Sequence, residues 1–159
     1  MTALAREGRA DAARIAAELE RDNTISGQEN AASALASRPT VEAKAEAWEQ
    51  AMVLENVPNE THRSVSVSFM RFGQEDLLAP YLDRYLESAD TIWERLGTHK
   101  ATTALRFMFP EPLASETLLD KVDAWLSTSE ANPAAKRFVR EGRDDVARAL
   151  RAQAKDAEG

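Results

Sequence analysis

The chain has 159 residues, of which 27 are acidic and 20 basic, a formal net charge of −7, and no cysteine. Its length fits one domain with its own hydrophobic core. The missing cysteine excludes disulfides and thiolate metal sites, and the acidic balance argues against binding to nucleic acid phosphates. We therefore expect a single domain, residues 1–159, which the patterns below predict to be helical. Because neither an apolar leader nor a run of about 18 apolar residues is visible, we expect it in the cytoplasm and without a membrane partner.

Apolar side chains recur every three or four residues along most of the chain, and glycine and proline separate these periodic segments. In the first half, Gly8 predicts the end of a short helix. Ser26 with Glu29 three positions later predicts a capping box, and Thr40 predicts another helix cap. The predicted helices of this half run over residues 9–21, 27–38, 41–54 and 61–72.

Residues 64–69 read Ser-Val-Ser-Val-Ser-Phe and alternate polar with apolar side chains. This alternation is typical of a strand. A single strand in an otherwise helical chain would leave its backbone groups without partners, whereas a helix costs only a few tenths of a kcal/mol per β-branched residue or serine. We therefore predict a helix here, ended by Gly73.

The second half contains the strongest periodic pattern, between residues 74 and 96. Pro80 suits the first turn of a helix, Gly97 predicts a break, and Ser115 predicts a cap. Asn132 followed by Pro133 is a strong helix start, since an N-cap precedes a proline in the first turn. The predicted segments are a lead-in at 74–78, a helix from Pro80 with a further turn reaching residue 96, a helix over 98–109, a helix after Ser115, and a helix over 133–154 that contains Gly142.

These segments predict an all-α protein of about eight or nine helices joined by short loops. Consecutive antiparallel pairs of helices suit an α-solenoid of the HEAT or armadillo kind. Because no clean repeat of about 40 residues is visible, we expect an irregular solenoid.

No enzyme signature is present among the motifs. His62 and His99 are too far apart to form the two-histidine turn of an HExxH zinc site, and we expect both to be exposed or to cap helices. No serine lies in a GxSxG elbow, and cysteine is absent. A small hydrolase whose catalytic groups are carboxylates is one further hypothesis, although no spacing of acidic residues calls for it. We therefore predict no catalytic residue, no metal ligand and no cofactor in this chain.

The three tryptophans lie on predicted apolar stripes and are expected in the core. Trp48 shares its stripe with Ala45 and Met52, while Trp93 and Trp125 lie on later helices. Tyr81, Arg84 and Tyr85 lie close together on one predicted helix, where tyrosines usually pack in the core. Tyrosine and arginine are also favoured contact residues, so the same residues could instead line a concave groove. The candidate peptide or interdomain contacts are Arg71, Gln74, Tyr81, Arg84 and Tyr85.

A series of short sequence matches extends over nearly the whole chain in a fixed order. It resembles the C-terminal, ER-aminopeptidase-like helical domain of actinobacterial aminopeptidase N. None of the matching stretches is a catalytic motif, but their order makes the resemblance fairly specific. The stretches are ELERDNT at 18–24, RPTVEAK at 38–44, RFGQ at 71–74, LAPY at 78–81, RYL at 84–86, ERLGTHKA at 94–101, FMFP at 107–110, ANPAAKR at 131–137 and VREG at 139–142.

This resemblance implies a parent protein of the zinc aminopeptidase family, which removes N-terminal residues from peptides. In that family the zinc lies in a catalytic domain with HExxH and GxMEN motifs, which this chain lacks. The resemblance implies that the present residues cap the active-site cavity, help peptide access and recognition, and have the catalytic domain and the peptide as partners. We expect a fragment cut from a longer enzyme, with a tendency to self-associate. The alternative is a stand-alone helical-repeat module that binds a protein or peptide.

Overall fold

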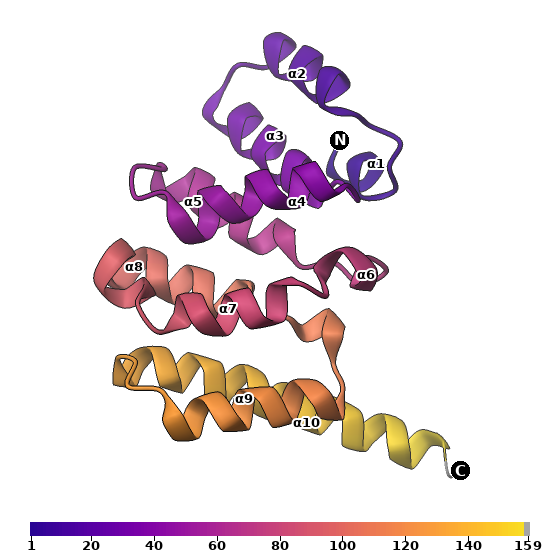
Figure 1. The fold of residues 1–159 in the computed structure, drawn as a ribbon. Coiled ribbons are helices and arrows are strands. Elements are labelled where there is room, and N and C mark those ends of the chain that lie inside the picture. Colours follow the sequence, from indigo (N-terminus) through magenta and orange to yellow (C-terminus); the bar gives the residue numbers. More distant parts are fainter. Residues whose placement is uncertain (158–159) are drawn as a thin grey trace. The chain divides into compact units, whose positions relative to one another are not determined.

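The computed structural model describes residues 1–157, and its helices fall into two compact units, residues 1–78 and 79–159 (Figure 1). Every regular element of the described residues is helical, which confirms the all-α prediction. The first unit contains α1 (Thr2–Arg6), α2 (Ala12–Arg21), α3 (Ile25–Ser37), α4 (Val41–Trp48), the π-helical turn η1 (Glu49–Val53), α5 (Asn59–Phe69) and α6 (Glu75–Leu78).

Side-chain caps fix where the helices of the first unit begin. The side chain of Asp11 accepts from Arg14 N at 2.8 Å at the start of α2, and Thr40 caps α4 as predicted. The predicted capping box at Ser26 was wrong. Thr24 is the N-cap of α3 and accepts from Gly27 N at 3.0 Å, because α3 begins one residue before Ser26.

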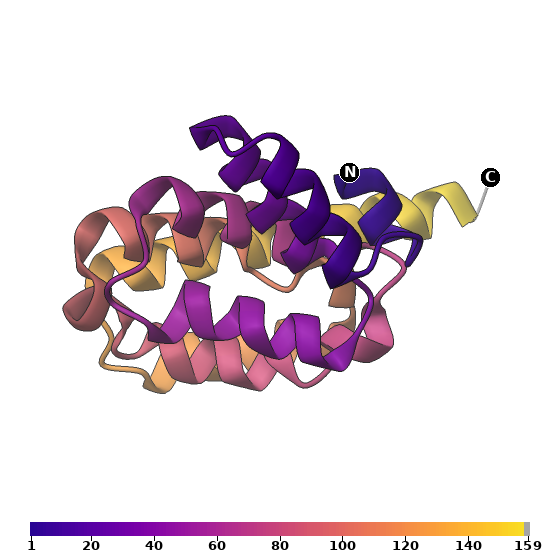
Figure 2. The ribbon, with the colours of Figure 1, turned by 90° about the horizontal axis from the view of Figure 1, so that it is seen from above.

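Small side chains bring α3 and α5 into close contact. Ser33 and Ser37 of α3 donate hydroxyl hydrogen bonds to the carbonyls of Ser64 and Ser68 on α5, at 3.5 and 3.4 Å. The serines that gave the strand-like alternation thus belong to a helix, which confirms the helical prediction for this segment. On the other side of α3, α1 and α2 both pack against it (Figures 1 and 2) around an alanine-rich core that includes Ala5, Ile15 and Ala34.

The buried face of α4 differs from the predicted one by one residue. Trp48 and Met52 are buried as expected, but Ala45 is exposed and Lys44 is buried instead. Trp48 packs against Phe69 of α5, with ring centroids 5.8 Å apart. This shift places an ammonium group in the interior of the first unit.

The second unit contains α7 (Tyr81–Ala89), α8 (Ile92–Phe107), the 3₁₀ turn η2 (Glu111–Leu113), α9 (Glu116–Thr128) and α10 (Pro133–Ala157). Gly97 interrupts α8 with φ +75°, so the predicted break is confirmed. The cap by Ser115 is also confirmed. At the start of α10, the side chain of Asn132 accepts from Ala134 N at 2.9 Å, again as predicted.

Tyr85 lies at the centre of the second unit. Its ring is fully buried and meets Phe109 edge-on at 5.5 Å, and its hydroxyl donates to the carbonyl of Leu105 at 2.6 Å. Trp93 and Trp125 are only partly buried, so the prediction that all three tryptophans lie in the core is right for Trp48 alone among them. Amphipathic stripes place a side chain on one face but do not say how deep that face lies.

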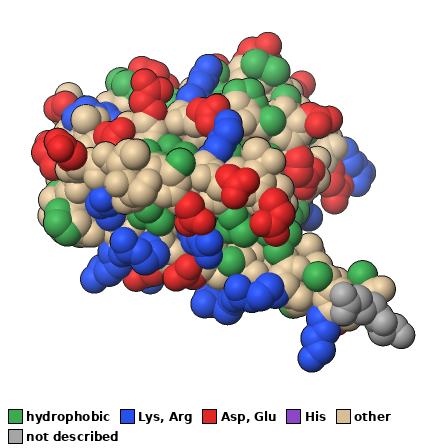
Figure 3. All heavy atoms as spheres, turned by 60° about the horizontal axis from the view of Figure 1, so that its bottom comes forward, with side chains coloured by type: hydrophobic (Ala, Val, Ile, Leu, Met, Phe, Trp, Pro, Cys, Tyr) green, Lys and Arg blue, Asp and Glu red, His purple; other side chains and the backbone are tan. Residues whose placement is uncertain are grey.

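Charged pairs hold α9 to its neighbours in this unit. Arg143 of α10 donates two hydrogen bonds of 2.8 Å to the carboxylate of Asp123, which lowers the pKa of that carboxyl. Lys121 pairs with Asp83 of α7 at 2.7 Å. Figure 3 shows basic and acidic side chains interleaved on the face that carries α10, which fits a solvated surface.

Gly142 lies inside α10 because Phe109 occupies the space next to it. A Cβ atom at this position would lie 2.5 Å from the Phe109 ring. Glycine in a helix interior ordinarily costs about 1 kcal/mol relative to alanine. Here the close approach of the aromatic ring reverses that preference.

We therefore expect Gly142→Ala to destabilise the chain by about 1–3 kcal/mol through overpacking, measured by urea denaturation. In a Phe109→Ala background the same substitution should be neutral or stabilising, because the ring is gone and the helix propensity gain remains. A Gly142→Ala variant as stable as the original chain would contradict this account of the packing.

Candidate functional site

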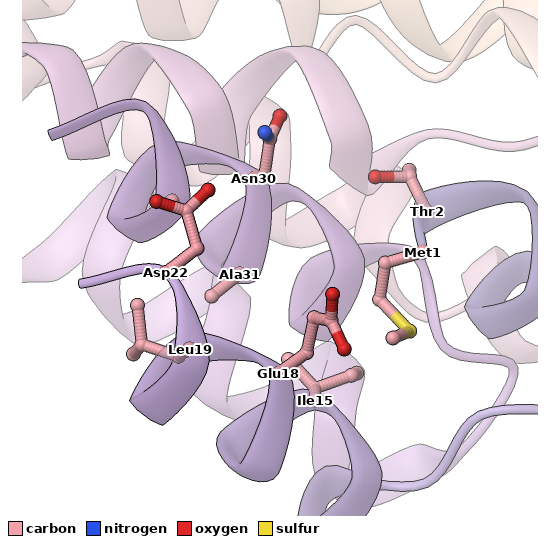
Figure 4. Close-up of a pocket in the computed structure, with 9 residues that line it drawn as sticks. Met1, Thr2, Ile15, Glu18, Leu19, Asp22, Asn30 and Ala31 are labelled. Carbon is pink, nitrogen blue, oxygen red and sulfur yellow. The ribbon is translucent and has the colours of Figure 1, made fainter. Parts of the chain in front are cut away.

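A hollow of about 270 Å³ lies between α1, α2 and α3 (Figure 4). Its two carboxylates already have partners, since Asp22 accepts from Thr24 at 2.8 Å and Glu18 pairs with Arg21 at 3.6 Å. No nucleophile with a positioned base lines it among the described residues. The lining residues are Met1, Thr2, Ile15, Glu18, Leu19, Asp22, Gly27, Asn30 and Ala31. This hollow is a packing feature without the groups that catalysis requires.

A second polar feature of the first unit has unusual electrostatics. It consists of Arg6, Lys44, Arg71 and Gln74, which we call the cationic cluster. Its centre is Lys44, whose side chain is fully buried. The Nζ atom donates to the carbonyls of Ala36 at 3.0 Å and Phe69 at 2.7 Å, which lie at the C-terminal ends of α3 and α5.

Burial governs the charge of Lys44. Desolvation, and to a smaller extent the nearby positive charge of Arg71, lower the pKa of the ammonium group from 10.5 to about 7. The two carbonyls suit either state, because a neutral amine still has two N–H donors for them. The carbonyl ends of two helices also carry partial negative charge, which offsets an ammonium ion where no carboxylate is close.

Arg71 has no such compensation. Its Nε is buried, and no described residue accepts a hydrogen bond from it. Burial lowers the pKa of the guanidinium, and the positive charge of Arg6 lowers it further. The acid nearest in sequence, Glu75, accepts from Gly73 N at 2.7 Å. Arg71 is thus a half-buried cation with no anionic partner among residues 1–78 of its own unit.

Gln74 links the cluster to the rest of the unit. Only 6% of the residue is exposed, and its Nε2 donates to the carbonyl of Ser37 at 3.0 Å. A longer contact of 3.5 Å reaches the carbonyl of Arg6. Its Oε1 is buried and has no donor among the described residues. The cluster therefore holds two unsatisfied polar atoms, a donor on Arg71 and an acceptor on Gln74.

The five predicted contact residues are divided between the units. Arg71 and Gln74 belong to the first, and Tyr81, Arg84 and Tyr85 to α7 of the second. Tyr81 is buried, with the exposed Arg84 guanidinium 5.1 Å from its ring centroid. Tyr85 has no exposed surface and is a core residue of this structure. None of these placements tests a contact with a peptide or another domain, so the contact role stays a prediction.

The two histidines differ from each other. His99 is exposed, as predicted. The same prediction was wrong for His62, which is buried with its Nε2 2.9 Å from the carbonyl of Ala51. Within residues 1–157 no three His, Asp or Glu side chains gather closely enough to hold a metal ion. Among the helices of this range, we find none with the length and apolar character that a bilayer crossing requires.

Sequence reasoning found Arg71 and Gln74 but missed Lys44 and Arg6. A signal for Lys44 was available, because it precedes Trp48 by four residues and so lies on the same helix face. Nothing in the sequence indicates that Arg6, which comes 65 residues before Arg71, would lie near it. That proximity depends on how α1 packs against α3.

Comparison with known proteins defines the class. The sequence profile of the ERAP1-like C-terminal domain matches residues 1–148, a range that runs through both units. The chain belongs to the ERAP1-like C-terminal domain family. It is 42% identical over 154 residues to aminopeptidase N of Streptomyces lividans, a match that covers 97% of this chain and 18% of that relative. The resemblance drawn from the sequence is confirmed, and the chain spans less than a fifth of the length of this curated relative.

The lowered pKa of Lys44 predicts how stability depends on pH. Between about pH 7 and 10 an unfolded Lys44 keeps its proton while the folded one has lost it, so stability should rise with pH. We expect the difference in unfolding free energy between the original chain and Lys44→Met to rise by up to about 1.4 kcal/mol per pH unit over this range.

Urea denaturation at several pH values measures this difference. Tyr81 and Tyr85, whose pKa values are raised by burial, are present in both chains and cancel. The exposed Lys155→Met variant is the matched control and should show no such difference. If the unfolding free energies of the original chain and Lys44→Met changed with pH in parallel, this would contradict a lowered pKa at Lys44.

Proposed function

We propose that this chain is a non-catalytic C-terminal domain of a zinc aminopeptidase, which removes N-terminal residues from peptides. The observation that carries the proposal is the 42% identity to aminopeptidase N of Streptomyces lividans over 97% of the chain. In this proposal the zinc belongs to a catalytic domain elsewhere in the parent polypeptide. The present domain caps the active-site cavity and takes part in peptide access and recognition.

We infer further that both units together form one domain built as an irregular solenoid. The family profile supports this, because it runs across both units. Helix pairing inside each unit supports it too, since α3 packs against α5 and α4 in the first unit, and α10 packs against α8 and α9 in the second. The cytoplasmic location expected from a cysteine-free chain is part of the same proposal.

The proposal assigns contact roles to Arg71, Gln74, Tyr81, Arg84 and Tyr85. Arg84 is the most direct to test, because it is exposed and lies against the Tyr81 ring. Arginine and tyrosine together are favoured at interfaces. The partners in this proposal are the catalytic domain and the peptide substrate.

The central experiment separates the catalytic part of the parent enzyme from this chain. We expect the pure chain with added zinc to show no hydrolysis of an aminoacyl anilide. We expect the catalytic part to cleave the anilide, and addition of the chain to lower the KM for longer peptides much more than for the anilide. Arg84→Ala should weaken that effect, while Arg151→Ala, at an exposed position on α10, serves as the control.

Zinc-dependent turnover by the pure chain would refute the non-catalytic role. Tight binding of an unrelated peptide with no effect on the catalytic part would favour the alternative, a stand-alone peptide-binding module.

The first unit also supports the expected self-association. Ile25 and Val41 are 75% and 65% exposed, and a separate hollow of about 270 Å³ in the same unit is lined by alanine, leucine and some polar side chains of α2 to α5. Exposed apolar surface of this kind favours association. We expect light scattering to detect concentration-dependent oligomers, reduced by the double substitution Ile25→Ser and Val41→Ser. A strictly monomeric chain at high concentration would contradict this expectation.

A further inference from the structure

We infer that a hollow at the turn between α9 and α10 binds a primary alkylammonium group, which pairs with Asp90 and Glu130 and packs against the ring of Trp125. The hollow has a volume of about 370 Å³ and lies wholly within the second unit. It is lined by Asp90, Trp125, Thr128, Ser129, Glu130 and Ala131. None of the five residues with a proposed contact role is among them, so the inference goes beyond the proposed function and is tested separately from it.

Hydrogen bonds fix the shape of the hollow. The Ser129 hydroxyl donates to the carboxylate of Asp90 at 2.5 Å, which joins the turn to the end of α7. The same hydroxyl oxygen accepts from Ala131 N at 3.0 Å. The carbonyl of Ser129 accepts from Lys136 Nζ at 2.7 Å, which joins the turn to the start of α10. A ligand therefore meets walls that are already in place, and binding need order little of the chain.

The charges around the hollow favour one positive charge on the ligand. Asp90 and Glu130 are exposed, and no lysine or arginine is among the lining residues. The ion pairs found within residues 79–157 involve neither of these acids. Lys136 lies next to the turn, but its ammonium group donates to a backbone carbonyl. Two carboxylates and this ammonium leave one negative charge uncompensated, which a single cation neutralises.

The indole of Trp125 favours an organic cation over a metal ion. Trp125 is only partly buried and lines the hollow. A cation over the face of a tryptophan ring is attracted by the ring electrons, and the methylene groups of an alkylammonium ion find apolar surface beside it. A metal ion fits less well, because residues 1–157 contain no group of three His, Asp or Glu side chains that could hold one. The volume also exceeds what a bare ion needs.

The acceptors around the hollow favour a primary ammonium over a quaternary one. A primary ammonium carries three N–H donors, and charge-assisted bonds to the carboxylates of Asp90 and Glu130 are the strong ones. The Thr128 hydroxyl donates to the carbonyl of Ala124 at 2.9 Å, so its oxygen keeps lone pairs for a third N–H. A quaternary ammonium has no N–H for any of these oxygens. The ligand class is therefore a small primary amine or the lysine side chain of another polypeptide.

A direct test follows the indole N–H resonance of Trp125 by NMR in the 159-residue chain. Trp125→Phe assigns this signal among those of the three tryptophans. Since Nε1 of Trp125 has no acceptor within residues 79–157, its resonance reports changes in the hollow. n-Butylammonium chloride replaces sodium chloride at constant ionic strength. We expect a saturable shift of the Trp125 signal, while that of Trp48 in the first unit stays unchanged.

Two double variants test the carboxylates. Asp90→Asn with Glu130→Gln should weaken binding about tenfold, because both negative charges are lost. The asparagine oxygen still accepts from the Ser129 hydroxyl, so the shape of the turn is kept. The matched control, Glu87→Gln with Asp120→Asn, removes the same charges from exposed positions on α7 and α9. It should leave the dissociation constant within about twofold, because salt screens distant exposed charges. Equal affinities of the two double variants would overturn the inference.

Further variants and ligands separate the charge of the ligand from its apolar part. Trp125→Leu should weaken binding about fivefold, followed by the amide resonance of Ala131. n-Butanol, the neutral counterpart of the amine, should give no saturable shift, and tetramethylammonium should bind more weakly than n-butylammonium. Saturable binding of n-butanol with equal affinity would overturn the ammonium as ligand. Tighter binding of tetramethylammonium would overturn the pairing with the carboxylates, and no saturation with any amine would overturn the site.

Nα-acetyl-lysine amide identifies the source of the amine. It presents the ammonium on a lysine side chain with a peptide group on either side. Tighter binding than n-butylammonium supports a lysine of another polypeptide, and weaker binding supports a free small amine. The hydrolysis experiment with the separated catalytic part does not depend on this result, because it reports the effect of the whole chain on peptide KM.

Discussion

The first unit depends on one buried ammonium group. Helices α3 and α5 pack closely through serines and end near each other, so their last carbonyls would lack donors. Lys44 supplies two such donors, because its Nζ lies 3.0 Å from the carbonyl oxygen of Ala36 and 2.7 Å from that of Phe69. Gln74 adds a donor to the carbonyl of Ser37 in the same region. Two helix ends thus take the place of a counterion, and α4 and the segment before α6 are fixed to them.

This arrangement has an electrostatic consequence for Arg71. The partial negative charge of these helix ends offsets the positive charge of Lys44. A second cation in the same region has no further negative group of this kind to offset its charge. The structure nevertheless places Arg71 there with Nε buried, and Arg6 adds to the repulsion. Burial and the charge of Arg6 both disfavour the charged form of the guanidinium at this position. The cationic cluster is therefore the part of the first unit where the polar groups are least well matched.

The sequence predicted the helical class and most helix limits, because caps and breaks are local. Thr40, Gly97, Ser115 and Asn132 needed no knowledge of the rest of the fold. The errors have tertiary causes. His62 is buried because its imidazole meets the carbonyl of Ala51, 11 residues earlier in the chain. Lys44 replaces Ala45 on the buried face of α4 because its ammonium group donates hydrogen bonds to the carbonyls of Ala36 and Phe69 there. Of the cationic cluster, sequence reasoning could name Arg71 and Gln74 but could not show that they lie next to other cations.

Packing also distinguishes Tyr85 from the cationic cluster as a candidate contact residue. Tyr85 fills the core of the second unit and its hydroxyl is satisfied by the carbonyl of Leu105, so packing accounts for its ring and its polar atom. Arg71 and Gln74 each keep an unsatisfied atom after every described contact has been made. The chain belongs to the ERAP1-like C-terminal domain family, and the aminopeptidase relative is more than five times as long as the match. Buried polar atoms without a partner are rare in folded proteins, so these two atoms are the ones that packing within the first unit leaves unexplained.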